Sequence, residues 1–273
     1  MNNFQIYRSG NHIKYDQYHD TFKIYDFETL FIFHGLFGRG RNWQTFSKML
    51  TKNEDLIVIS VDLRNHGGNE FKRKHSYSLM MDEVIELFNH LNIKKTNILG
   101  HSMGGKLAML ITLSQPQYVN KLIVADIAPV NYPLEQQNIV DSLLDLNLDL
   151  ITSRSQADEL LSNTITEKFV RAFLIQNLEL FEDKYRWSVN LLAIKEAMDN
   201  LRSFPFSEKV KIVENKTLCI YGQDSDYVTK ENLNNFSYFF PNISFVKIEN
   251  AGHYLHVEQP KEFYNALRNF LIN

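Results

Sequence analysis

The chain has 273 residues, of which 44% are hydrophobic and 22% charged, with a formal net charge of −3 at pH 7. This composition is typical of a globular protein, and the charge gives no electrostatic reason to expect nucleic acid or an anionic membrane as partner. The single cysteine, Cys219, excludes an internal disulfide. Neither a signal sequence nor an apolar run of membrane-spanning length is recognisable, so we expect a cytoplasmic protein.

Strand and helix patterns alternate in the first half of the chain. In chain order they predict a hairpin over 4–8 and 12–19, a strand over 29–33, a helix over 42–49, a strand over 55–63, a helix from a Ser78 cap to Leu91, a strand ending at Leu99, a helix over 102–114 and a strand over 121–127. Such alternation indicates a parallel sheet with helices on both of its faces.

The alternation stops after residue 130. Over residues 132–204 no strand pattern is recognisable, and apolar residues recur at helical spacing. The sheet pattern then resumes with a strand over 217–221, a helix from about Thr229, a strand over 243–248 and a helix from Pro260. We therefore predict a core domain of residues 1–130 and 205–273, with a helical cap inserted over 131–204.

The most informative stretch runs from Thr96 to Lys106, where an apolar run leads into Gly-His-Ser-Met-Gly-Gly and then into a helix-forming segment. A serine between glycines at a sharp strand-to-helix turn has an exposed hydroxyl on a strained backbone, the setting of a nucleophile. Ser102 is therefore the predicted nucleophile. The amide of Met103, at the start of the helix, is expected to donate to a developing oxyanion.

A serine nucleophile needs a base, and His253 is the predicted base because it follows the last strand and precedes the last helix. Loops at the carboxyl ends of parallel strands gather at one edge of a sheet, where Ser102 also lies. The third group should be a carboxylate between the two in chain order. Asp126 is favoured because a carboxylate that ends an apolar strand needs a partner, and Asp224 and Asp226 stay open.

Ser225 occupies the position, three residues beyond the glycine that ends a strand, where many hydrolases with this pattern carry their acid. We expect it to support the histidine or the aspartate, or to be a plain turn serine. The second oxyanion donor is expected from the glycine-rich loop after residue 33, from Leu36 or else from Phe37. Structural roles are expected for His34, His66, His101 and His256.

Together these motifs resemble the α/β-hydrolase superfamily and, within it, the YbfF-type esterases. The matching blocks are residues 34–38, 62–67, 100–106, 126–130, 225 with 227–228, and 251–253. The resemblance implies a mostly parallel eight-stranded sheet with a helical cap insertion. It also implies a triad of Ser102, Asp126 and His253, with Ser225 as an accessory hydroxyl near the histidine.

The resemblance further implies carboxylesterase or acyl hydrolase activity. We predict a serine hydrolase that acts on a small-molecule acyl ester or thioester with a hydrophobic acyl group, without metal or cofactor. Two alternatives stay open: a carbon–carbon bond hydrolase with the same machinery, and a ligand receptor that keeps the triad for capture. The apolar faces of the insertion also raise the expectation of a homodimer formed through the cap.

Overall fold

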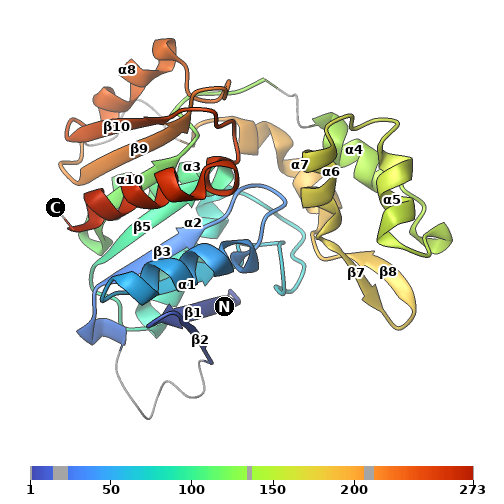
Figure 1. The fold of residues 1–273 in the computed structure, drawn as a ribbon, viewed down its shortest axis with the longest axis horizontal. Helices are drawn as coiled ribbons and strands as arrows, with labels where there is room; N and C mark the ends of the chain where they lie inside the picture. Colours follow the sequence, from blue (N-terminus) through green and yellow to red (C-terminus); the bar gives the residue numbers. More distant parts are fainter. Residues whose placement is uncertain (1, 15–23, 134–136, 206–211, 273) are drawn as a thin grey trace.

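The computed structural model describes residues 2–14, 24–133, 137–205 and 212–272. In this part of the chain, one eight-stranded sheet runs through the body of the molecule in the order β10-β9-β6-β5-β3-β4-β1-β2 (Figure 1). The strands are β1 (Phe4–Arg8), β2 (Asn11–Ile13), β3 (Thr29–Phe33), β4 (Ile57–Val61), β5 (Thr96–His101), β6 (Val119–Ala125), β9 (Lys216–Gly222) and β10 (Ile243–Ile248). All pairs from β10 to β4 are parallel, and β1 is antiparallel to β2 and β4. The prediction of a mostly parallel eight-stranded sheet is confirmed.

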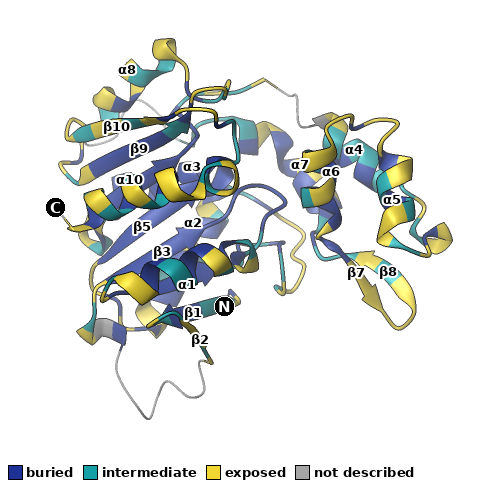
Figure 2. Cartoon of the chain, in the orientation of Figure 1, coloured by how far each residue is buried: buried dark blue, intermediate teal, exposed yellow. Residues whose placement is uncertain are grey.

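Helices cover both faces of this sheet because successive residues of each central strand point to opposite faces and both faces are apolar. In β3, Phe31 and Phe33 belong to one buried cluster, whereas Leu30 and Ile32 belong to the other. The first cluster includes residues of α2 (Tyr77–His90), α3 (Met103–Ser114) and α8 (Lys230–Phe239), and the second includes residues of α1 (Gln44–Asn53) and α10 (Pro260–Ile272). Figure 2 shows the central strands buried and the outer faces of α1 and α10 exposed.

Most predicted boundaries agree with the structure to within a few residues, but the predicted cap of α2 is wrong. The cap is Ser76, whose hydroxyl accepts a backbone N–H of the first turn at 3.3 Å and whose backbone is extended, with φ of −163°. Ser78 lies inside the helix. Of the second predicted hairpin run, 12–19, the strand β2 ends at Ile13, and residues 15–19 lie outside the described part of the chain.

Between β6 and β9 the chain leaves the sheet and forms a group of small elements beside it (Figure 1). These are α4 (Gln137–Asp145), α5 (Arg154–Leu161), α6 (Lys168–Ile175), β7 (Leu178–Phe181), β8 (Lys184–Trp187) and α7 (Leu191–Arg202). The prediction that residues 132–204 hold no strand is wrong, because β7 and β8 pair as an antiparallel hairpin. Charged residues interrupt both strands, at Glu179, Lys184 and Arg186, so neither forms a continuous apolar run, and most of their residues are exposed or half-buried. Their turn places Glu182 and Asp183 at positive φ instead of the usual Asn-Gly.

Candidate active site

Ser102 stands at the turn between β5 and α3, at the carboxyl edge of the sheet. Its φ of 53° lies in the left-handed region, which costs a non-glycine residue about 1–2 kcal/mol. Close packing requires the glycines on either side. A Cβ on Gly100 would lie 2.1 Å from the carbonyl oxygen of Gly104, and a Cβ on Gly104 would lie 2.3 Å from that of Phe33. The sequence therefore forces a tight turn that presents the Ser102 side chain to the cavities described below.

Asp126 follows β6, the neighbour of β5, and its φ is also positive, at 51°. Its side chain is completely buried and accepts three hydrogen bonds. Oδ1 accepts the Gly222 amide at 3.0 Å, and Oδ2 accepts the Nδ1–H of His253 at 2.8 Å. The hydroxyl of Ser225 donates to the same Oδ2. These donors compensate the burial of a charge, so the carboxylate fixes the orientation of the imidazole.

The two other acids that the sequence left open lie elsewhere. Asp224 and Asp226 are both exposed to solvent. Of the three candidate carboxylates, the structure brings Asp126 to His253. One face of the imidazole is covered by Tyr227, whose ring stacks on it with a centroid distance of 4.0 Å. The sequence indicated Tyr227 only as part of a matching block, without a role.

Two backbone amides beside Ser102 lack an acceptor among the residues that the structure describes. Leu36 and Met103 border the same cavity as Ser102 and are both buried, and within the described residues neither backbone N–H has a protein acceptor. Unpaired buried amides are rare in proteins and suit a site where negative charge develops. Phe37 differs, because its N–H donates to Nε2 of His66 at 3.2 Å. Of the two loop residues that the sequence left open, Leu36 has the free amide.

Two cavities meet at Ser102. The larger has a volume of about 260 Å³, and the smaller about 60 Å³. Side chains of the insertion line the larger one, and they are apolar: Ile139, Val170, Phe173 and Leu174. The smaller is lined by Tyr77, Met103, Lys106, Tyr132, Met198 and Leu201, among others. Residues of the insertion therefore line both cavities next to Ser102.

In the four histidines for which the sequence predicts structural roles, burial favours the neutral form. Burial lowers the pKa of His34 to about 4 and those of His66 and His256 to about 3, and it places the pKa of His101 well below its ordinary value. Nε2 of His34 accepts the Leu63 amide at 2.9 Å, as expected for a residue that holds the loop. His101 donates to the carbonyl oxygen of His253 at 2.8 Å. Through these contacts His34 and His101 hold neighbouring loops in place.

Lys106 was missed by sequence reasoning, because its partners are carbonyl groups almost a hundred residues away. It lies one turn into α3 from Ser102, and only 2% of it is exposed. Its Nζ donates to the carbonyl oxygens of Leu201, Arg202 and Ser203 at 3.4, 2.6 and 3.2 Å, at the end of α7. Burial lowers the pKa of Lys106 to about 7. The lysine thus joins α3, the helix that follows Ser102, to α7, the last helix of the insertion.

Comparison with known proteins agrees with this geometry. A family model described as the alpha/beta hydrolase fold matches residues 28–260, and the chain belongs to that family. Within it, the chain is a hydrolase of the esterase and lipase group. It is 31% identical to the sn-1-specific diacylglycerol lipase ABHD11 of Danio rerio, over 90% of this chain and 79% of that protein. It is 28% identical to the esterase YbfF of Escherichia coli, over 87% of this chain and 91% of that protein.

A solved structure described as a marine microorganism esterase is also similar. It is 32% identical to this chain, covers 98% of both chains and superposes with a TM-score of 0.88. The expected likeness to α/β hydrolases and YbfF-type esterases is thereby confirmed. In the part of the chain that the structure describes, no helix is both long and apolar enough to span a membrane.

Proposed function

We propose that the protein is a serine carboxylesterase that cleaves esters or thioesters of hydrophobic acids, with Ser102, His253 and Asp126 as its triad. The observation that carries the proposal is the 2.8 Å hydrogen bond from Nδ1 of His253 to the buried Asp126, in a histidine that lines the same cavity as Ser102. The functions of the relatives described above, a lipase and two esterases, support the same reaction class.

The proposed mechanism follows from these contacts. Because Nδ1 of His253 holds its proton against Asp126, Nε2 is free to take the proton of Ser102 as the hydroxyl attacks the acyl carbonyl. The amides of Leu36 and Met103 stabilise the oxyanion, and losing one such donor costs about 3 kcal/mol in well-studied hydrolases. The protonated histidine then gives its proton to the leaving alcohol or thiol. Water, activated by the same histidine, releases the acid.

Ser225 has an accessory role in this proposal. Its hydroxyl donates to the oxygen of Asp126 that also accepts from His253. It therefore helps to hold the carboxylate in place and does not contact the reacting atoms. The apolar wall of the larger cavity, with Val170, Phe173 and Leu174, supports a hydrophobic acyl group, where each buried methylene contributes roughly 0.8 kcal/mol.

The test is kcat/KM on nitrophenyl esters of increasing acyl length, with Ser102→Ala as control. We expect turnover by the wild type that peaks at one chain length and falls at least about a thousandfold in Ser102→Ala, because the nucleophile is lost. Equal rates for the two proteins at every length would reject the ester reaction. Cleavage of a β-diketone by the wild type under the same conditions would then favour the carbon–carbon bond hydrolase, and a single slow event per molecule would favour the receptor.

A further inference from the structure

In the loop after β3, both backbone polar groups of Phe37 are hydrogen-bonded to side chains from other segments. Its N–H donates to Nε2 of His66 at 3.2 Å, and its carbonyl oxygen accepts from Nδ2 of Asn177 at 2.7 Å. His66 belongs to the core, in the loop after β4, whereas Asn177 belongs to the insertion, between α6 and β7. His66 and Asn177 are therefore far apart in the sequence, yet both bind the residue next to Leu36.

Phe37 needs such support because its backbone is strained. Its φ is 61°, a left-handed conformation that is costly for a bulky residue. The Gly38 amide donates to the Gly35 carbonyl at 2.9 Å, so Leu36 and Phe37 form the middle of a tight turn. The Leu36 N–H belongs to the Gly35–Leu36 peptide at the start of this turn, so closure of the turn through Phe37 constrains the direction of that amide. A looser Phe37 would let that amide turn away from Ser102.

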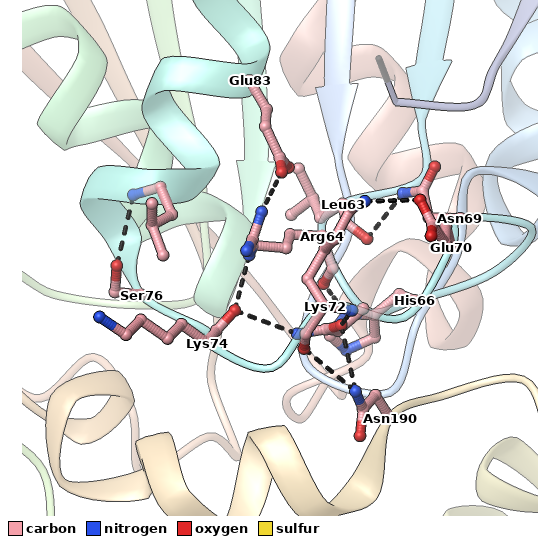
Figure 3. Close-up of polar contacts among 12 residues, drawn as sticks. Leu63, Arg64, His66, Asn69, Glu70, Lys72, Lys74, Ser76, Glu83 and Asn190 are labelled. Atoms are coloured by element: carbon pink, nitrogen blue, oxygen red, sulfur yellow. Dashed lines mark hydrogen bonds and ion pairs between the residues drawn. The ribbon is translucent and has the colours of Figure 1, made fainter.

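His66 is fixed in the one tautomer that can hold Phe37. Its Nδ1–H donates to the carbonyl oxygen of Arg64 at 2.8 Å, which leaves Nε2 with a lone pair for the Phe37 amide. The side chain is fully buried, and polar contacts order the loop around it over residues 63–76 (Figure 3). In that figure the insertion also reaches this loop, through Asn190 Nδ2, which donates to the Lys72 carbonyl at 3.1 Å.

Asn177 is also held in place by hydrogen bonds, to other residues of the insertion. It is 3% exposed, its amide donates to the Leu174 carbonyl at 3.0 Å, and its carbonyl accepts the Ser188 amide at 2.8 Å. Next to it, Gln176 accepts from Arg39 at 2.6 Å through its carbonyl and from Asn42 at 2.7 Å through its side chain. The glycine-rich loop is thus bound to the insertion at the end of α6.

We propose that His66 and Asn177 are positioning residues that clamp Phe37 and so aim the Leu36 amide at the oxyanion. The proposal rests on the proposed function, because it assigns these residues to its oxyanion hole. It gives the insertion a part in the chemistry, beyond lining the acyl cavity. Neither residue touches the reacting atoms, and both act through the loop.

The first test compares three histidine variants. His66→Leu removes the acceptor and is expected to lower kcat about 10- to 100-fold, with less than about a threefold change in KM, because a misaimed donor is lost in the transition state. His66→Gln offers an oxygen near the position of Nε2 and should recover most of kcat. His75→Leu is the matched control. His75 is buried and its ring lies against His66 at 5.8 Å, but neither ring nitrogen has a partner within the described residues.

A second readout reports the oxyanion hole directly. A trifluoromethyl ketone forms a tetrahedral adduct with the serine and places its oxyanion in the hole, whereas the matching methyl ketone forms little adduct. For His66→Leu we expect the inhibition constant of the trifluoromethyl ketone to rise in parallel with the loss of kcat. The constant of the methyl ketone should stay within about twofold. A merely structural defect would weaken both compounds alike or neither.

Asn177→Leu, nearly isosteric, removes the donor on the other side. We expect a loss of kcat of the same kind as in His66→Leu, and the double variant should lose much less than the product of the two single losses, because both act on one residue. Multiplying losses would overturn the clamp. So would failure of His66→Gln to recover activity, or an equal loss in His75→Leu.

The design separates failure of the clamp from failure of the proposed function. If Ser102→Ala matches the wild type, the ester reaction itself is rejected. If Ser102→Ala is inactive and His66→Leu is fully active, only the clamp is rejected. Should His66→Leu fail to fold, His66→Asn takes its place, because its side chain is too short to reach the Phe37 amide. Recovery in His66→Gln relative to His66→Asn is then expected, and equal kcat in those two variants would reject the clamp.

Discussion

At the scale of single residues, the orientation of His253 depends on one oxygen atom. Oδ2 of Asp126 accepts from both His253 and Ser225, and Oδ1 accepts from the Gly222 amide. All three donors need an acceptor, and an amide group in place of the carboxylate supplies only one acceptor oxygen. In the proposed mechanism, the negative charge of Asp126 also stabilises the imidazolium that forms on His253.

We therefore expect Asp126→Asn to lower kcat about 10³- to 10⁴-fold, because the amide favours the wrong histidine tautomer, as in the serine protease from which that magnitude comes. Nitrophenyl ester kinetics measure the loss, and circular dichroism checks that the variant is folded. Asp226→Asn is the matched control, since Asp226 is exposed and changes the same charge. It should stay within about twofold of the wild type. A collapse in Asp226→Asn with Asp126→Asn active would reassign the acid.

At the scale of elements, two lysines bind the carbonyl end of a helix in the same way. Lys106 donates to the end of α7, in the insertion, and Lys121 donates to the carbonyl oxygens of Phe270 and Leu271 at 3.1 and 2.6 Å, at the end of α10. Cations at that end of a helix are favourable because its carbonyl groups lack partners within the helix. Only Lys106 borders the smaller cavity at Ser102.

This pair allows stability and function to be separated. Lys106→Met is expected to lower the free energy of unfolding by about 1–3 kcal/mol, since buried carbonyl groups lose their donor. It should also lower kcat/KM, because the end of α7 is released from α3, the helix that follows the proposed nucleophile Ser102. Lys121→Met should cost stability alone. Urea unfolding and ester kinetics on both variants test this, and equal kcat/KM in the two would show that the α7 contact does not matter for the site.

The elements show what the sequence alone could predict. β3 and β10 form over the residues predicted for them, because short runs rich in apolar and β-branched residues, bounded by turn residues, specify strands locally, whether the strand is buried like β3 or lies at the edge of the sheet like β10. The exposed hairpin of β7 and β8 carries no such signal. Likewise, Ser102 and His253 stand at recognisable turns. His66 and Asn177 have contacts with Phe37 that depend on packing between distant segments, which no local pattern records.

At the scale of the whole molecule, the insertion is one of the places where large apolar side chains reach the surface. Several large apolar side chains are exposed on it: Leu150, Leu160, Phe169, Leu180, Phe181 and Leu192. The association of two copies through residues 131–204 stays a prediction. The interior of the core contains a row of buried histidines, His34, His66 and His75, whose neighbouring rings are tilted against one another with centroid distances of 5.1 and 5.8 Å.

These three histidines make the whole fold sensitive to acid. Burial lowers their pKa values to about 4, 3 and 3, whereas an unfolded histidine titrates near pH 6.5. Between these values the unfolded chain binds more protons than the folded chain. The free energy of unfolding therefore falls as the pH drops below about 6.5, by up to about 1.4 kcal/mol per pH unit for each such histidine.

Urea unfolding between pH 5 and 7.5 measures this slope, and His75→Leu isolates the share of one histidine. His75 has no hydrogen-bond partner on either ring nitrogen within the described residues, so its removal breaks no polar contact there. We expect the free energy of unfolding of His75→Leu to depend less steeply on pH than that of the wild type. The slopes should differ by the uptake of one proton, or roughly 1.4 kcal/mol per pH unit near pH 5. Parallel pH profiles for the two proteins would mean that His75 is protonated in the folded state as readily as in the unfolded chain, and that this histidine contributes nothing to the acid sensitivity of the fold.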